Sequence, residues 1–411
     1  SHWRGGEAPS EYRKPFVHLL RGSMELNHRL LVCAALTCAS APVVHALSPI
    51  AAGILSPEQR SSSQEVAERA AAPAAAPIAA PTAAPVSALQ RASSGGSSLC
   101  KDGRLIPEFY LIGCKNTGSS SLFADLSARG VIPAPGGPHK EWQYFRRNAR
   151  EGTPVAEEER TWLHSMPQCP SNRTVMGDFS MTNYFTVPFP DDLRMAPGHY
   201  FDPLHKVQSW DTPNLIRQFS GDAAKKLQFM ILLREPLDRV QSDYYQSMKA
   251  GSCKACRVHD NFAESFASNA QLLQQSPPRI SSWFWRSMYA RHLEEWLKHF
   301  DAAQFIFTPF RQYISVDPPT FSASLLSRLR IQAEPWLEAS HENVHYDKQP
   351  LDVELPPGSA SRQAFQAFFV AENERLVKLL ARAHLAGAWL PGYSGVPGDE
   401  SHVRAWLESS W

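Results

Sequence analysis

The strongest constraint on the fold is a pair of apolar runs, each followed by a polar loop and a helical pattern. Glu108 to Gly113 is a short apolar run ended by glycine, and the loop after it leads through Gly118 into a helical pattern. Lys226 to Leu233 is a continuous apolar run, typical of a parallel strand buried on both faces. These strand–loop–helix units predict an α/β, P-loop-like three-layer fold. Its central, mostly parallel sheet is flanked by helices, and a ligand lies at the carboxyl ends of the strands.

The N-terminal part of the chain has a different composition. Residues 1–55 contain an uncharged, largely apolar stretch from Leu30 to Leu55 that follows Arg29, which is typical of a signal peptide or a type II signal anchor. Both alternatives stay open. Residues 56–99 are rich in alanine and proline and predict a disordered stem. We therefore expect one folded catalytic domain at 100–411, with membrane contact only through the N-terminal segment if it is uncleaved.

The overall charge excludes one class of partner. The chain has 41 Lys+Arg against 40 Asp+Glu, a formal net charge of +1. No large field of one sign is available to attract nucleic acid. Any anion-binding site must therefore be local, and nucleic acid is not an expected partner.

The first loop has the composition of an anion site. A glycine loop that feeds a helix directs backbone N–H groups and the positive end of the helix at one point, which suits phosphate or sulfate. It is not a Walker A loop, because Ser119-Ser120 stands where Lys-Ser/Thr is required. The predicted ligand-binding residues of the loop are Lys115, Asn116, Thr117, Gly118, Ser119, Ser120 and Ser121.

A second candidate anion site follows the second apolar run. Arg234 leaves the carboxyl end of this strand, Pro236 suits a first helical turn, and Ser242 lies two turns after Glu235. An arginine fork and a serine hydroxyl can hold one phosphate between them. The structural alternative is a surface arginine paired with Glu235 or Asp238.

Together, the two segments resemble the nucleotide-binding motifs of sulfotransferases that use 3′-phosphoadenylyl sulfate (PAPS). They are most similar to the Golgi carbohydrate group that includes the heparan sulfate enzymes. The resemblance implies that the first loop holds the 5′-phosphosulfate and that Arg234 and Ser242 hold the 3′-phosphate. It implies PAPS as donor, PAP as product and no metal. The expected acceptor is a hydroxyl or amine of a glycan, and the expected location is the secretory pathway, either the Golgi lumen or outside the cell.

Further segments extend the resemblance and its mechanism. His139-Lys-Glu141 and the aromatic residues after it are similar to the family segment whose glutamate is the catalytic base. This implies that Glu141 takes the acceptor proton, with His139 as a substitute base, while Lys115 stabilises the bridging oxygen. Lys140 and Asp178 are expected to contact the acceptor, although an aspartate at a strand end serves equally well as a cap.

The sequence also departs from the family pattern. Thr182 stands where the family has proline, so its acceptor contacts cannot be transferred, and no cysteine follows Cys256 to form the C-terminal disulfide loop. We expect the stretch from 346 to 362 to close over the nucleotide instead. Cys253 and Cys256 have the spacing of a local disulfide or a pair of free thiols, and Cys100 and Cys169 are candidates for a further bridge.

Three alternative functions stay open. The chemistry could be directed at a small alcohol or metabolite, the loop could belong to an ATP-dependent P-loop kinase, or the chain could be a noncatalytic nucleotide-binding module.

Outside the motifs, we expect Trp283, Trp285 and Trp296 to be core residues more than a platform for sugars. The apolar pattern from Gln363 to His384 predicts a helix that packs on the sheet.

Overall fold

The computed structural model describes residues 97–134, 140–141, 143–145, 155–196, 211–249, 261–341 and 348–409. The chain divides into two units, Ser1–Thr82 and Ala83–Trp411, and every described residue belongs to the second. The leader and nearly all of the stem lie outside the described residues, so their boundaries stay predictions. Within the described ranges, no helix has both the length and the apolarity that crossing a membrane requires.

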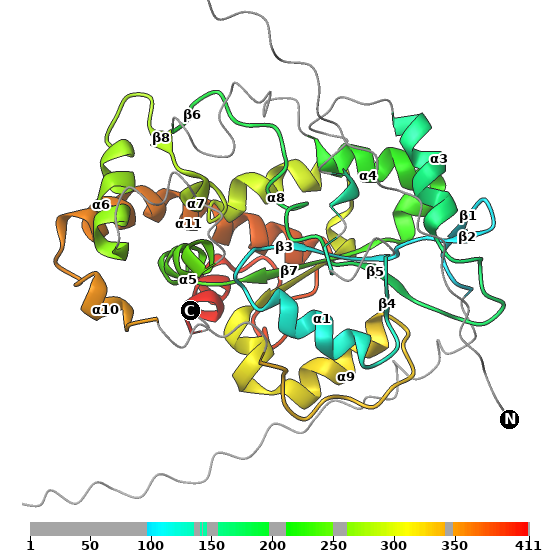
Figure 1. Cartoon of the computed structure of the whole chain (residues 1–411). Coiled ribbons are helices and arrows are strands. Elements are labelled where there is room, and N and C mark those ends of the chain that lie inside the picture. The colour runs from blue at the N-terminus through cyan, green and yellow to red at the C-terminus, as the bar shows by residue number, and fades with distance from the viewer. Residues whose placement is uncertain are drawn as a thin grey trace, which may run out of the picture. The chain divides into compact units, whose positions relative to one another are not determined.

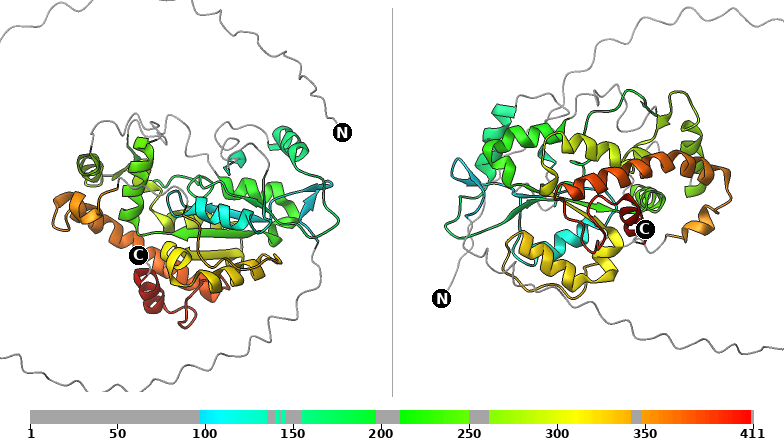
Figure 2. Two further views of the ribbon diagram at one scale, coloured as in Figure 1. Left: turned by 60° about the horizontal axis from the view of Figure 1, so that its bottom comes forward. Right: turned by 180° about the vertical axis from the view of Figure 1, so that it is seen from behind.

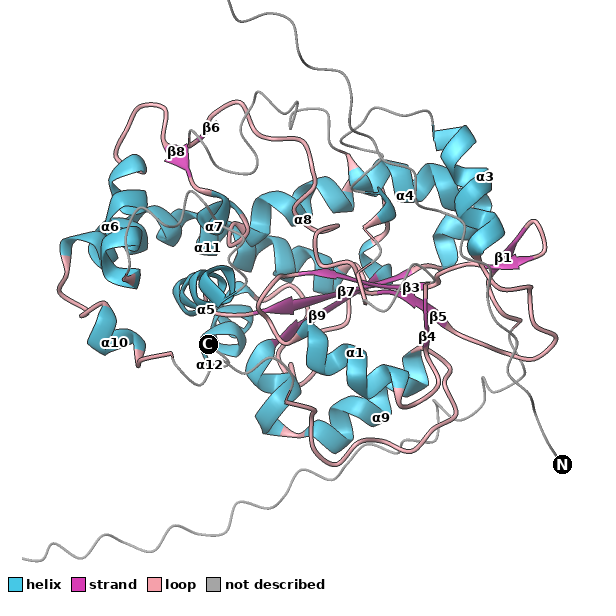
Figure 3. Cartoon of the chain, in the orientation of Figure 1, coloured by secondary structure: helices cyan, strands magenta, loops and turns pink. Residues whose placement is uncertain are grey.

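The centre of the described domain is a sheet of five parallel strands, magenta in Figure 3. Its α/β architecture with flanking helices confirms the predicted fold class. In spatial order the strands are β4 (Ile132–Pro133), β5 (Met176–Asp178), β3 (Phe109–Gly113), β7 (Gln228–Leu233) and β9 (Phe305–Pro309).

Alternate side chains of the central strands face two separate cores. Phe109 and Leu111 of β3 pack in the core that includes α1 (Ser119–Ser127) and α9 (Pro318–Arg328), the two helices below the sheet in Figure 1. Tyr110 and Ile112 belong to the core on the other side. Because the strands are apolar on both faces, they require helices on both, as the sequence indicated.

The second core is the larger one and is built from the remaining helices. Seen from behind, α11 crosses in front of α8, and the two helices are in contact (Figure 2). The helices on this side and at the ends of the sheet are α3 (Val155–Ser165), α4 (Thr212–Ser220), α5 (Pro236–Lys249), α6 (Phe262–Leu272), α7 (Ser282–Trp285), α8 (Tyr289–Leu297), α10 (Leu351–Glu354), α11 (Ala360–Leu385) and α12 (Glu400–Ser409).

Two predictions about this core are tested directly. Trp283, Trp285 and Trp296 are all buried, which confirms them as core residues. Helix α11 matches the helix predicted at 363–384, but its main neighbours are α6, α8, α12 and the 3₁₀ turn Ala302–Gln304. The helix therefore packs mainly on other helices rather than directly on the sheet, and Trp296 of α8 contacts Phe229 of β7.

Small pairs of strands complete the domain. β1 (Cys100–Lys101) pairs antiparallel with β2 (Arg104–Leu105), and a disulfide joins Cys100 to Cys169. β6 (Arg194–Met195) pairs with β8 (Arg279–Ile280). Cys253 and Cys256 lie outside the described residues, so their pairing stays open.

The order of the strands determines where a site is expected. From β3 the chain proceeds to β4 and β5 on one side, and then returns to β7 and β9 on the other. The direction of winding therefore reverses between β3 and β7. Crevices at the carboxyl ends of strands on either side of such a reversal are the usual ligand sites of open α/β sheets. Both predicted anion sites follow these two strands.

Candidate functional site

The glycine loop, Cys114–Gly118, connects β3 directly to the first turn of α1. Asn116 and Gly118 have φ values of 66° and 86°, so the loop turns through the left-handed region twice. The hydroxyl of Thr117 donates to the carbonyl of Cys114 at 2.6 Å and accepts from the N–H of the same residue at 3.1 Å. Thr117 thus holds the loop closed, and its buried side chain is not part of the cavity wall.

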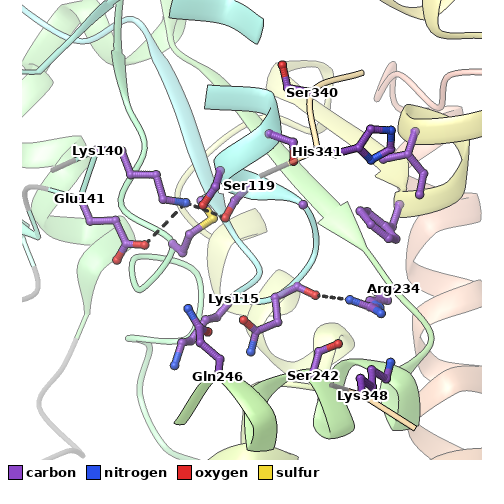
Figure 4. Close-up of a pocket in the computed structure, with 17 residues that line it drawn as sticks. Lys115, Ser119, Lys140, Glu141, Arg234, Ser242, Gln246, Ser340, His341 and Lys348 are labelled. Carbon is purple, nitrogen blue, oxygen red and sulfur yellow. Dashed lines mark hydrogen bonds and ion pairs between the residues drawn. The ribbon is translucent and has the colours of Figure 1, made fainter. Parts of the chain in front are cut away.

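The loop opens onto a cavity of about 440 Å³. Most predicted ligand-binding residues surround it, and Figure 4 shows Lys140 and Glu141 on one side, with Arg234, Ser242 and Lys348 on the opposite side. The predicted site residues that line the cavity are Lys115, Asn116, Gly118, Ser119, Ser120, Ser121, Lys140, Glu141, Arg234 and Ser242. The two sequence segments therefore form parts of one wall.

Arg234 connects the two segments by a hydrogen bond. It donates to the backbone carbonyl of Asn116 at 3.0 Å, across 118 positions of sequence, and its guanidinium lies 5.0 Å from the centre of the Phe310 ring. It also pairs with Asp238 at 2.6 Å. The two predictions for Arg234 are thus compatible, because the same side chain pairs with Asp238 of α5 and also lines the cavity.

Asp238 holds a second cation of the cavity wall. Its other carboxylate oxygen pairs with Lys348, so one carboxylate serves two cations. Burial lowers the pKa of Lys348, and Asp238 opposes that shift. Burial would raise the pKa of Asp238, but Arg234 and Lys348 hold it below its ordinary value. These three side chains form an ionic group with one positive charge in excess.

Lys115 lies at the base of the cavity, with its ammonium 3.1 Å from Asp243. Burial lowers the pKa of Lys115, while the carboxylate of Asp243 acts in the opposite direction. Asp243 is fully buried and also pairs with Arg239 and Arg286. The lysine is thus the part of a buried ionic cluster that reaches the cavity.

Lys140 and Glu141 form the opposite wall, next to the start of α1. Lys140 donates to the hydroxyl of Ser119 at 2.8 Å and lies 3.8 Å from Glu141. Gln143 donates its side-chain amide to Glu141 at 3.1 Å. Burial lowers the pKa of Lys140, and Glu141 opposes the shift. Glu141 therefore keeps a carboxylate at the cavity edge, held in place by an amide and a cation.

Asp178, like Thr117, is a predicted site residue that does not line the cavity. Asp178 is buried at the end of β5, where it accepts from the N–H of Ser180 at 2.8 Å and from Asn183 at 3.4 Å. Burial raises its pKa. This geometry corresponds to the strand-end cap, the alternative that the sequence left open. His139 lies outside the described residues.

Several cavity residues were not identified from sequence. Gln246 follows Ser242 by one helical turn, so helical periodicity offered a signal for it. Phe310 comes directly after β9, another strand end. Ser340 carried no signal, because its place depends on Asp125 of α1, which accepts its hydroxyl at 2.6 Å. The cavity residues missed by sequence reasoning are Met181, Gln246, Phe310, Ile314, Ser340 and His341.

The stretch expected to close over the nucleotide lies beside the cavity in its described part. Lys348 lines the cavity of about 440 Å³ next to the glycine loop, whereas Arg362 lines a neighbouring one of about 510 Å³, to which Arg234 and Phe310 also belong. Across the described ranges, no group of three or more His, Cys, Asp or Glu side chains is arranged to hold a metal ion.

Comparison with solved structures finds several similar chains. The chain is similar to a solved structure of a sulfotransferase from Alicyclobacillus acidocaldarius, with 20% sequence identity and a TM-score of 0.42, over 67% of this chain and 96% of that one. No family model matches the chain, and no curated protein matches its sequence.

Proposed function

We propose that the protein transfers a sulfuryl group from PAPS to an acceptor, and that the cavity between the glycine loop and α5 is its active site. One observation carries this proposal. The two segments that resemble sulfotransferase motifs line the same cavity of about 440 Å³, at the ends of the neighbouring strands β3 and β7. Either segment alone is compatible with an ordinary turn, whereas their meeting in one cavity supplies two anion sites.

The donor has an anionic group for each of these sites. The amides of the glycine loop, the start of α1 and the hydroxyls of Ser119 and Ser120 suit the 5′-phosphosulfate. Arg234 and Ser242 suit the 3′-phosphate, because a guanidinium and a hydroxyl together can bind several of its oxygens. Asp238 stands behind Arg234 and fixes its orientation.

In the proposed reaction, the acceptor oxygen attacks the sulfur in line with the bridging oxygen. The new S–O bond forms as the bond to the bridging oxygen breaks, and PAP leaves with the negative charge. Glu141 takes the proton of the acceptor, and Lys115 stabilises the charge on the leaving oxygen. Lys140, which lies between Glu141 and Ser119, is suited to orient the transferring group.

We propose a glycan as acceptor and the secretory pathway as the place of action, as in the Golgi carbohydrate group. The apolar leader, the Ala/Pro-rich stem and the Lys140-Glu141 segment support this, and the disulfide between Cys100 and Cys169 is typical of an oxidising compartment. On the acceptor side, the described residues Lys140 and Glu141 pair one cation with one carboxylate, so their charges cancel. Because this pair does not select a charged acceptor, a small alcohol is the alternative.

The test is transfer of labelled sulfate from PAPS to a panel of glycans and small alcohols. We expect transfer by the full chain and its loss in Lys115→Ala. Arg404→Ala serves as the matched control, because it removes only the surface pair with Glu374. PAP at 100 times its dissociation constant should stabilise the fold by about 2.7 kcal/mol. Stabilisation by ATP with magnesium but not by PAP would support a kinase, and binding of PAP without transfer to any acceptor would support a noncatalytic module.

A further inference from the structure

The carboxylate of Asp243 divides its partners between its two oxygens. Oδ2 lies 2.8 Å from Arg286 and 3.1 Å from Arg239, whereas Oδ1 lies 3.1 Å from the ammonium of Lys115. Arg239 is itself fully buried and donates to the hydroxyl of Ser287 at 2.6 Å. One oxygen is therefore committed to the protein framework, and the other faces the lysine of the cavity.

Lys115 is the exchangeable member of this cluster. Its side chain is 29% exposed, while those of Asp243 and Arg239 are 0% exposed and that of Arg286 is 13% exposed. Arg239 also donates to the backbone carbonyl of Lys115 at 3.4 Å, which ties the glycine loop to α5. The backbone of Lys115 is thus fixed, and its ammonium can move between Asp243 and a ligand.

The positive and negative charges of the cluster are unequal in number. One carboxylate faces three cations, so the group carries two positive charges in excess. Arg286, Lys115 and Arg239 overcome the effect of burial and hold the pKa of Asp243 well below its ordinary value. For Lys115, burial and the two arginines lower the pKa, and Asp243 raises it. The two arginines therefore keep Asp243 ionised, and ionised Asp243 keeps Lys115 protonated.

We propose that Asp243 is a positioning residue that keeps Lys115 charged and directed at the cavity, and that Arg239 and Arg286 confine this action to a single oxygen. A lysine held from one side by one oxygen can transfer its contact to an anionic group that enters the cavity. The charge and the direction of Lys115 depend only on the cluster. The effect of Lys115 on the leaving oxygen rests on the proposed function.

The test measures the charge of Lys115 without any turnover. The full chain is treated with an amine-acylating reagent between pH 7 and 8, and the modification of Lys115 is followed by mass spectrometry. Asp243→Asn should accelerate acylation of Lys115 by roughly tenfold or more, because loss of the carboxylate favours the neutral amine. Lys348 is the internal control, because its partner is Asp238, which the substitution of Asp243 leaves in place. An unchanged ratio of Lys115 to Lys348 acylation in folded Asp243→Asn would overturn the proposal.

A second variant keeps the test decisive if Asp243→Asn does not fold. Arg286→Gln removes one cation from Asp243 and leaves Arg239 in place, so acylation of Lys115 should become slower. The opposite signs of the two effects distinguish positioning from general loosening, which would accelerate acylation in both. Equal or faster acylation in Arg286→Gln would contradict the proposal.

Turnover then separates this inference from the proposed function. In Asp243→Asn, kcat should fall about tenfold at pH 8 and less at pH 6, with PAP still bound. If no sulfate transfer occurs in any variant but acylation changes as expected, the proposed function fails and the role of Asp243 stands. If transfer occurs and its pH profile is the same in Asp243→Asn, Asp243 does not act through Lys115.

Discussion

Substitution of Gly118 by alanine tests the packing of the glycine loop against the segment that follows β9. Gly118 has φ of +86°, and a Cβ there would lie 2.5 Å from the ring of Phe310. The left-handed backbone costs about 1–2 kcal/mol for an L-residue. Forcing a methyl group against a packed ring costs about 1–3 kcal/mol more. We therefore expect Gly118→Ala to lower the free energy of unfolding by about 2–5 kcal/mol.

Two further variants separate these contributions. Gly130 has φ of +87° and nothing within 4 Å of an added Cβ, so Gly130→Ala measures the backbone cost alone. Phe310→Ala removes the ring that the methyl group would meet. In that background, Gly118→Ala should cost only the backbone part, about 1–2 kcal/mol.

The assay is urea-induced unfolding of the full chain, followed by tryptophan fluorescence, for the double-mutant cycle of Gly118→Ala and Phe310→Ala. We expect the two substitutions to be coupled by about 1–3 kcal/mol, and Gly130→Ala to show no coupling with Phe310→Ala. A coupling below about 0.5 kcal/mol at Gly118 would refute the reasoning, because it would mean that the ring and the loop are not in tight contact.

Three other predictions concern the proposed chemistry and location. Glu141→Gln should reduce kcat by roughly 10²–10⁴-fold with unchanged PAP affinity, measured by labelled sulfate transfer and calorimetry, and near-normal turnover would exclude Glu141 as base. Arg234→Ala should weaken PAP binding by about 1.5–3 kcal/mol but barely affect adenosine 5′-phosphosulfate, and an equal loss for both ligands would contradict its role at the 3′-phosphate. In a eukaryotic secretory host, the exposed Asn172 of the sequon Asn172-Arg-Thr174 should carry a glycan that an endoglycosidase removes, and Asn172→Gln should abolish that mass shift. A protein of unmodified mass would count against a luminal location.

The central strands were predictable because each is required to be apolar on both faces. The runs ending at Gly113 and Leu233 have no polar face, so only a sheet covered on both sides can bury them. The polar residues directly after such strands then lie at one edge of the sheet. The pattern predicted an anion site after each strand, and the resemblance to sulfotransferase motifs assigned Lys115 and Arg234 to one nucleotide.

The remaining parts of the site depend on contacts that local pattern does not encode. Asp243 lies on an amphipathic helix and looks like a solvated charge in sequence, but it is buried because Arg239 and Arg286 neutralise it. Ser340 reaches the cavity because Asp125 of α1 accepts its hydroxyl and its backbone N–H. Arg239 lies on the same helix as Asp243, but Arg286 and Asp125 lie on other elements than the residues they hold, so these contacts follow from tertiary structure.

The direct pairing of β3 with β7 has a consequence for which molecules the protein can select. Each of the two strands leads into one of the proposed anion-binding segments, and because the strands are hydrogen-bonded neighbours, the sheet fixes how far apart the two segments begin. Neighbouring strands are separated by about 4.8 Å, a spacing that side-chain rearrangements do not alter. Under the proposed function, a molecule with one phosphate fills only one of the two segments, and a molecule with two is selected by the distance between its phosphate groups.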